Sequence, residues 1–159
     1  MAEFTYNPVQ TVLPNQPVIL NTSIGCPHGY VLHRNESGIV TLRGIVNSCG
    51  CFARYQVTFN GNIAIPDGGE APAGISVALA LDGEPILTSR AIVTPADTAT
   101  DPPTQLNFFN VTSTAIVNVA KGCCVNVSVE NTSESADPLE TPAPPILVQN
   151  ANLTVARIA

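Results

Sequence analysis

The sequence predicts an all-β protein whose antiparallel strands pack as a sandwich or a barrel. The stretch 75–81 alternates apolar and small residues with a period of two, as a strand with one buried face does. Asp82-Gly83 follows directly and suits the tight turn of a β-hairpin. The fourteen prolines all fall in expected turns, loops or strand margins, and no amphipathic helical window of useful length occurs. About eight to ten short strands at this spacing are typical of sandwiches and barrels.

Composition narrows the possible partners. A chain of 159 residues suits one domain with a single core. Only 11% of the residues are charged and the net charge is −6, so a large share of the surface is uncharged and invites self-association. The basic residues are scattered singly along the sequence, which argues against nucleic acid as a partner. They are Arg34, Arg43, Arg54, Arg90, Lys121 and Arg157.

The first residues lack the basic and apolar regions of a secretory signal, and no apolar run approaches transmembrane length. We therefore expect a protein made in the cytoplasm, with no membrane as partner. Its cysteines are then expected as reduced thiols.

The first part of the chain predicts short, interrupted strands. Residues 1–10 are expected to form an extended N-terminal arm with Phe4 and Tyr6 as anchors, and residues 11–159 a single domain. Residues 12–20 suit an edge strand, because prolines interrupt them and an edge tolerates their missing donors. A Gly-led strand over 38–46 and an aromatic strand over 52–59 follow.

Three further segments complete the prediction. A strand is expected over 86–93 as the second arm of the hairpin, and a long strand over 106–119 with a bend near Thr112–Thr114. Strands over 123–129 and 148–158 close the chain, with proline-rich loops at 95–104 and 137–145. The alternation assigns an inward row to each strand. The predicted core is Val40, Leu42, Tyr55, Val57, Phe59, Ile75, Val77, Leu79, Val125, Val127, Val129, Leu153 and Val155.

The opposite face of the 75–81 strand carries Ser76, Ala78 and Ala80. Such small, nearly apolar residues suit close approach by another surface rather than exposure to water. We expect either the second sheet or a neighbouring subunit to cover them.

The candidates for chemistry are few. No catalytic or phosphate-binding motif is present, so we expect no enzyme and no cofactor. Cys26, His28, Cys49 and Cys51 are ligand types that suit zinc. Single-residue spacing between paired ligands makes their geometry awkward, so the preferred interpretation is two polar loops with no metal.

The order of features resembles a known family. A Pro-interrupted strand precedes a Gly-led strand and an aromatic strand, and a hairpin of the form apolar-x-apolar-Asp-Gly-x-Pro-Ile follows. Gly-Cys-Cys-Val-x-Val then opens a strand, and Asn-Ala-Asn-Leu-Thr-Val-Ala-Arg-Ile closes the chain. Over about residues 11–158 this pattern resembles the trimeric tumour necrosis factor-like (complement-type) jelly roll. The likeness is to its bacterial and phage branch, which includes phage capsid decoration proteins and the C-terminal domains of spore-surface collagen-like proteins.

The resemblance implies an antiparallel jelly-roll sandwich that assembles as a homotrimer. It also implies a structural virion protein of a tailed bacteriophage, a capsid decoration, cement or head-fibre protein. Such a protein lies on the capsid exterior, bound to a lattice of major capsid protein, after synthesis in the bacterial host. The alternative is a receptor- or glycan-binding head module on a phage, bacterial or spore surface, although the expected loops carry no aromatic platform.

Two interface hypotheses follow from the trimer. Phe4 and Tyr6 of the arm are expected to dock onto the capsid. One face of the 106–119 strand and of the 148–158 strand is expected to line the trimer axis, through Phe108, Asn110, Thr112, Asn152, Thr154 and Ala156.

Overall fold

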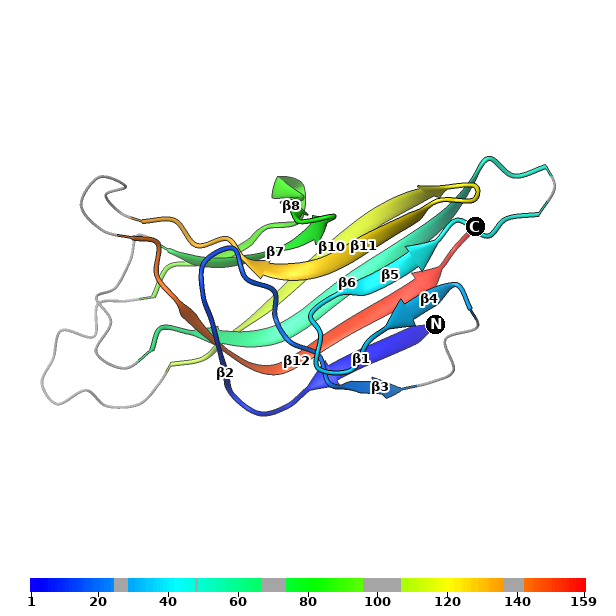
Figure 1. Cartoon of the computed structure of the whole chain (residues 1–159). Helices are drawn as coiled ribbons and strands as arrows, with labels where there is room; N and C mark the ends of the chain where they lie inside the picture. The colour runs from blue at the N-terminus through cyan, green and yellow to red at the C-terminus, as the bar shows by residue number, and fades with distance from the viewer. Residues whose placement is uncertain (25–28, 48, 67–73, 96–106, 136–141) are drawn as a thin grey trace, which may run out of the picture.

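A computed structural model describes residues 1–24, 29–47, 49–66, 74–95, 107–135 and 142–159. These residues form two six-stranded antiparallel sheets that face each other (Figure 1). The only helix among them is one 3₁₀ turn, η1 (Leu87–Ser89). None of the described residues lies in a helix long and apolar enough to cross a membrane. The all-β sandwich predicted from the sequence is confirmed.

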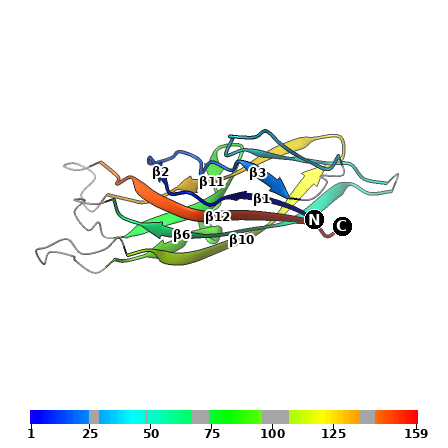
Figure 2. The same ribbon diagram turned by 90° about the horizontal axis from the view of Figure 1, so that it is seen from below.

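The first sheet has the order β10-β6-β12-β1-β3, with β2 also paired to β12. Figure 2 shows β1, β12, β6 and β10 side by side in this order. The strands are β1 (Ala2–Tyr6), β2 (Gln10–Val12), β3 (Thr22–Ile24), β6 (Phe52–Ala64), β10 (Phe109–Ala120) and β12 (Ile146–Arg157).

The second sheet has the order β4-β5-β11-β7-β8, with β9 also paired to β7. Its strands are β4 (Val31–His33), β5 (Val40–Arg43), β7 (Ile75–Leu81), β8 (Glu84–Pro85), β9 (Ala91–Val93) and β11 (Cys124–Asn131). Apart from the pairs β4–β5, β7–β8 and β7–β9, the strands adjacent in these sheets are separated by other strands in the sequence, so the sandwich closes through many long-range pairs.

The β7–β8 hairpin has the predicted turn. Asp82 and Gly83 both have positive φ, 50° and 87°, which matches the twist of the flanking strands. The predicted strand over 86–93 is wrong in its first half, because η1 follows Pro85. There the Ser89 hydroxyl accepts a bond from the backbone N–H of Leu79 (3.0 Å), in place of a strand partner.

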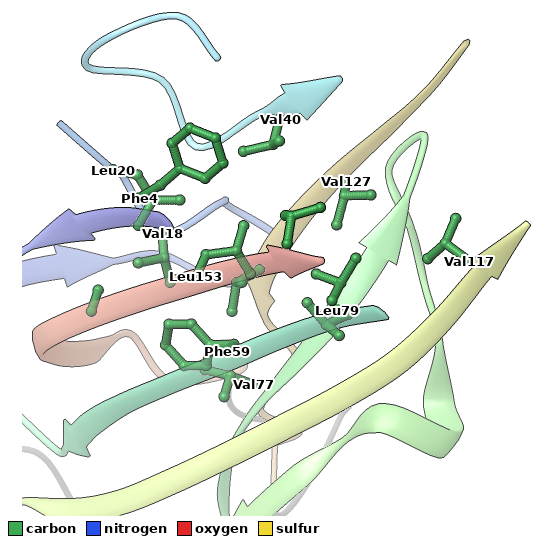
Figure 3. Close-up of a cluster of buried hydrophobic side chains, with 14 of the residues drawn as sticks. Phe4, Val18, Leu20, Val40, Phe59, Val77, Leu79, Val117, Val127 and Leu153 are labelled. Atoms are coloured by element: carbon green, nitrogen blue, oxygen red, sulfur yellow. The ribbon is translucent and has the colours of Figure 1, made fainter. Parts of the chain in front are cut away.

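The core lies between the sheets and matches the predicted one. Figure 3 shows Phe59 and Leu153 of the first sheet meeting Val77, Leu79 and Val127 of the second. Every predicted core residue is buried except Val125, which is half-buried and packs against the cluster. The period-two alternation therefore assigned the inward rows correctly.

Residues 1–10 do not form a separate arm, contrary to the prediction. Residues 2–6 are β1, which pairs with β12 on one side and β3 on the other. Phe4 has no exposed surface, and its ring lies 4.7 Å from that of His33 in β4. The N-terminal segment is extended as expected, but it is an integral strand, since Ala2 and Phe4 alternate inward.

The predicted bend in β10 is absent. β10 pairs with β6 from Phe109 to Ala120 without a register shift. The irregularity lies in β12 instead, between Gln149 and Asn152, where Asn150 has a φ of 54°. Asn tolerates this left-handed conformation better than most residues, which explains the position of the bulge.

Candidate functional site

The outer face of the first sheet is covered by uncharged side chains over three central strands. In β6 and β10, and in β12 after its irregularity between Gln149 and Asn152, the odd-numbered residues alternate inward and the even-numbered ones outward. We call this surface the Asn/Thr face. It comprises Gln56, Thr58, Asn60 and Asn62 of β6, Asn110, Thr112, Thr114 and Ile116 of β10, and Asn152, Thr154 and Ala156 of β12.

Strand register aligns these residues in rows across the sheet. In one row Thr112 lies opposite Asn60, which lies opposite Asn152. The next row is Thr114, Thr58 and Thr154, and a third is Ile116, Gln56 and Ala156. β1 extends the first two rows with Thr5 and Glu3, so a carboxylate enters only at the margin of the face.

Hydrogen bonds between neighbouring side chains hold the face in place. Asn60 Nδ2 donates to Thr112 Oγ1 (2.9 Å), and Asn110 Nδ2 donates to Asn62 Oδ1 (3.0 Å). The Thr114 hydroxyl donates to that of Thr58 (3.2 Å). Side chains fixed by such bonds lose little further rotamer freedom when another surface covers them.

The face is suited to burial against another flat surface. Covering it removes no formal charge from water, so the large desolvation penalty of buried ions does not arise. Its one large apolar side chain is Ile116, with 53% of its surface exposed. Thr, Asn and Ala side chains are short, which allows close approach of a second backbone.

The structure brings together five of the six residues predicted to line the trimer axis. Asn110, Thr112, Asn152, Thr154 and Ala156 all belong to the Asn/Thr face. The sixth, Phe108, precedes β10 and is half-buried outside the strand. No partner chain is present, so their role in association stays a prediction.

The predicted docking residues are placed differently. Phe4 is part of the hydrophobic core and presents nothing to a partner, because its ring fills the space between the sheets. Tyr6 is half-buried and packs against the same core. A docking role for Phe4 is therefore wrong.

The weak zinc candidates divide into two groups. Cys26 and His28 lie outside the described residues. Cys49 and Cys51 are exposed in the β5–β6 connection. Over the part of the chain that the structure describes, no group of three or more His, Cys, Asp or Glu residues is placed to hold a metal ion.

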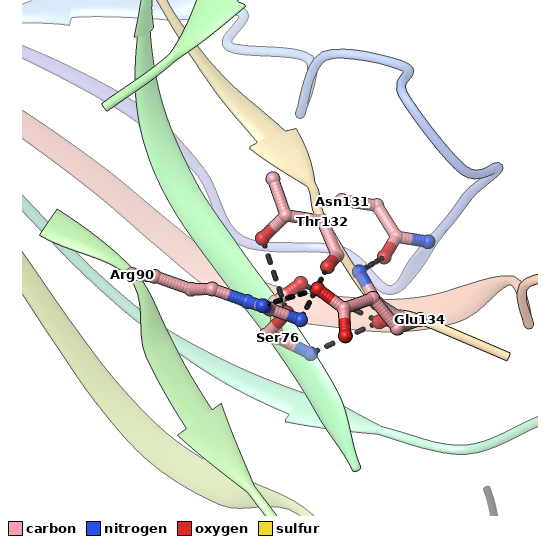
Figure 4. A network of polar contacts seen from close by, with 6 residues as sticks. Ser76, Arg90, Asn131, Thr132 and Glu134 are labelled. Atoms are coloured by element: carbon pink, nitrogen blue, oxygen red, sulfur yellow. Dashed lines mark hydrogen bonds and ion pairs between the residues drawn. The ribbon is translucent and has the colours of Figure 1, made fainter. Parts of the chain in front are cut away.

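A polar network on the second sheet was not predicted. Arg90 donates from Nε to Ser76 Oγ (2.9 Å) and from Nη2 to the Thr132 carbonyl (2.8 Å), and its Nη1 pairs with Glu134 (2.6 Å) (Figure 4). The small residues on the outer face of β7 thus admit an arginine from the same chain. Ser76, Ala78 and Ala80 are buried as expected, but Ser76 is in contact with this guanidinium rather than a second sheet or subunit.

Asn131 extends this network into the interior. Its amide donates to the carbonyls of Val12 and Pro144, both at 3.0 Å, and its Oδ1 accepts from the Ser133 N–H (3.0 Å). The side chain joins the end of β11 to β2 and to the segment that precedes β12. The only sequence signal was the run of small residues on β7, which left room for polar side chains from elsewhere.

Comparison with known proteins bears on the fold. No family model matches the chain, and no curated protein sequence matches it. The structure resembles the globular domain of zebrafish complement 1qA protein, with a TM-score of 0.54 and 14% identity, over 96% of this chain and 94% of that one. The chain has a C1q-like jelly-roll fold. This confirms the predicted fold class, and at this identity the likeness concerns the fold alone.

Two other solved structures are more distant from this jelly roll. One is the EclA C-terminal domain, a sugar-binding protein, with 15% identity and a TM-score of 0.33 over 82% of this chain and 87% of that one. The other is the CBM22-1 xylan-binding domain of Xyn10C from Paenibacillus barcinonensis, with 10% identity and a TM-score of 0.34 over 99% and 87%. Such TM-scores add nothing to the assignment.

Proposed function

We propose that this jelly roll is a structural module that assembles as a homotrimer through the Asn/Thr face. The observation that carries the proposal is the face itself, eleven outward side chains on three adjacent strands without a formal charge. The chain has six basic and twelve acidic residues, and none of them belongs to this face. A closed cyclic assembly buries such a face without extending into fibres.

The threefold symmetry is supported by the family resemblance of the sequence. The chemistry of the face supports self-association more generally, because amide and hydroxyl groups from a second copy complement its donors and acceptors. Association also covers Ile116, whose apolar surface is otherwise in water.

The proposed setting is the exterior of a tailed-phage capsid, where trimers made in the host cytoplasm bind the lattice of major capsid protein. This setting rests on the resemblance of the sequence, whereas the proposal that the protein has no catalytic activity rests on the absence of a known catalytic motif from the sequence. The alternative is a glycan-binding head.

Matched charge substitutions on the two sheets test the interface. Thr58 lies at the centre of the Asn/Thr face, and Thr41 is equally half-buried on the outer face of the second sheet. Thr58→Glu places like charges together around the axis, so we expect it to yield monomers in sedimentation velocity, whereas Thr41→Glu should sediment like the wild type. Equal behaviour of the two variants would refute the interface.

Two binding measurements separate the setting from its alternative. Purified protein is added to phage heads lacking decoration protein and, in parallel, to a glycan array. Saturable binding to the heads with no glycan signal supports the capsid role. Micromolar binding to a defined glycan together with no binding to heads would replace it with the glycan-binding head.

A further inference from the structure

One end of the sandwich gathers most of the positive charge of the chain. Four of the six basic residues, Arg43, Arg54, Lys121 and Arg157, lie where β5, β10 and β12 finish and β6 begins. We call this region the basic end. Both chain termini lie at the same end, as do the β10–β11 turn and the β5–β6 connection (Figures 1 and 2). The sequence alone shows these cations as isolated, because they are far apart along the chain.

Strand register places the four residues at the same end of the sandwich, with Arg54 on the outer face of the first sheet and Arg43 on the outer face of the second. Arg157 lies opposite Tyr55, the neighbour of Arg54 in β6, and Arg43 lies opposite Cys124 in β11. The Lys121 N–H donates to the Cys51 carbonyl (2.9 Å), which joins the two loops of this end.

A contact between the sheets completes the arrangement. The buried Tyr55 hydroxyl of the first sheet donates to the backbone carbonyl of Arg43 in the second (2.6 Å). This bond joins the two sheets beside the arginines. Gly44 is needed here, because a Cβ at this position would lie 1.8 Å from the Ala120 carbonyl oxygen. The close approach of the β10–β11 turn to the end of β5 therefore depends on this glycine.

The three guanidinium groups are held in position. Arg157 stacks over the Tyr30 ring, with 4.4 Å from Cζ to the centroid. Arg54 donates from Nε to Asn118 Oδ1 (3.1 Å) and lies 5.4 Å from the Phe52 centroid. Arg43 donates from Nη1 to the Gly29 carbonyl (3.3 Å). Ordered side chains lose less conformational entropy on binding than free ones.

The carboxylate side chains of the described residues form no ion pair with these three arginines. Within the described residues the ion pair is that of Arg90 with Glu134, and none joins Arg43, Arg54 or Arg157 to a carboxylate side chain. The backbone oxygen of Ala159 accepts from Arg157 Nε (3.2 Å), so the chain terminus occupies one donor there. Arg43 and Arg54 are exposed and Arg157 is half-buried, so all three side chains keep surface in contact with water.

We propose that the basic end docks an acidic, carboxylate-rich segment of a partner protein. Guanidinium groups match carboxylates through paired N–H donors, and an anionic partner gains from the local excess of cations. A nucleic acid fits less well, since a duplex-binding protein typically uses about six to ten phosphate contacts and the rest of this chain is negative. The surface is distinct from the Asn/Thr face and adjoins it at Arg54.

Assembly as a trimer would strengthen the binding of an acidic partner, and this step rests on the proposed function. Cyclic symmetry places equivalent ends at one level along the axis, so three basic ends face a partner together. Linked sites of this kind bind a repeating partner far more tightly than one site does. A repeating acidic surface is thus the partner that a trimer fits best.

The test measures binding of fluorescein-labelled deca-glutamate by anisotropy at low ionic strength, and then at rising NaCl. We expect saturable binding that weakens with salt. The double variant Arg43→Gln/Arg54→Gln should bind about tenfold more weakly. Arg34→Gln is the matched control, because Arg34 is an exposed arginine between β4 and β5, and it should bind within about twofold of the wild type.

Alkylation of the cysteine thiols at the same end gives an independent test of where the acidic segment binds. Cys51, Cys123 and Cys124 are exposed there, so bound deca-glutamate should slow their alkylation by iodoacetamide. Absence of binding, equal loss in the Arg34→Gln control, or tighter binding of a DNA duplex of equal charge would each overturn the inference. Binding by a wild-type monomer would leave it standing while refuting the trimer.

Discussion

At the scale of single residues, buried polar groups join parts of this sandwich to one another beside its apolar core. Asn131 has no exposed surface, and its amide donates to two carbonyls, that of Val12 in β2 and that of Pro144 just before β12. Tyr55 is equally buried and carries its hydroxyl across to the second sheet. Both side chains therefore link different strands through directed hydrogen bonds.

Removing the Asn131 amide leaves the Val12 and Pro144 carbonyls and the Ser133 N–H without this partner. We expect Asn131→Ala to lower the free energy of unfolding by about 2–4 kcal/mol, measured by urea denaturation. Asn47→Ala, at an exposed loop position, should change it by less than about 0.5 kcal/mol. Equal effects of the two variants would contradict the role given to Asn131.

Burial raises the pKa of Tyr55 above its ordinary value of 10.0, and the Arg157 guanidinium partly opposes this shift. The folded protein therefore keeps the proton to higher pH than the unfolded chain does, so the free energy of unfolding falls as pH rises above about 10. Tyr55→Phe removes this contribution and should show a shallower alkaline decline in thermal melts. It also costs about 1 kcal/mol at pH 7 through the lost hydrogen bond. Parallel pH profiles would contradict the assignment.

At the scale of elements, β11 is the strand on which the second sheet depends. It pairs with β5 along its first half and with β7 along its second, and Val127 belongs to both pairings. Backbone bonds from Asn15 and Val18 add the early proline-rich segment to the same strand. A defect in β11 therefore disturbs most of the second sheet.

Val127→Asp places an unpaired charge at a position with no exposed surface, which costs several kcal/mol. We expect this variant to fail to fold, as judged by insolubility or the absence of a cooperative melt. Asn126→Asp is the control, since the neighbouring side chain is exposed, and it should fold with a loss below about 1 kcal/mol. A soluble Val127→Asp protein with a cooperative melt would contradict the core.

The sequence predicts most of what depends on alternation within one strand. The inward row of β6 and the outward Asn and Thr residues of β10 and β12 follow from a period of two. Features that join distant segments were missed. Arg90 meets Thr132 and Glu134 only because β9 and β11 flank the same strand.

The N-terminal strand shows a different limit. β1 offers only two buried residues, Ala2 and Phe4, too few for alternation to distinguish a sheet strand from a loose arm. Its place between β12 and β3 is set by pairing with residues about 150 positions later in the chain. No local signal carries such a pairing.

At the scale of the whole molecule, two surfaces of different chemistry divide the sandwich. The Asn/Thr face is uncharged and consists mainly of short side chains. The basic end, in contrast, concentrates cations in a protein of net charge −6. The first suits copies of the same chain, and the second suits an acidic partner.

The mass of the wild-type protein in solution tests the central claim most directly. Multi-angle light scattering during size-exclusion chromatography at micromolar concentration measures it without a shape assumption. The subunit mass is 16.6 kDa, and assembly through the Asn/Thr face predicts three times that value. A single peak at the subunit mass, unchanged as the concentration rises, would contradict the trimer and the structural role proposed for it.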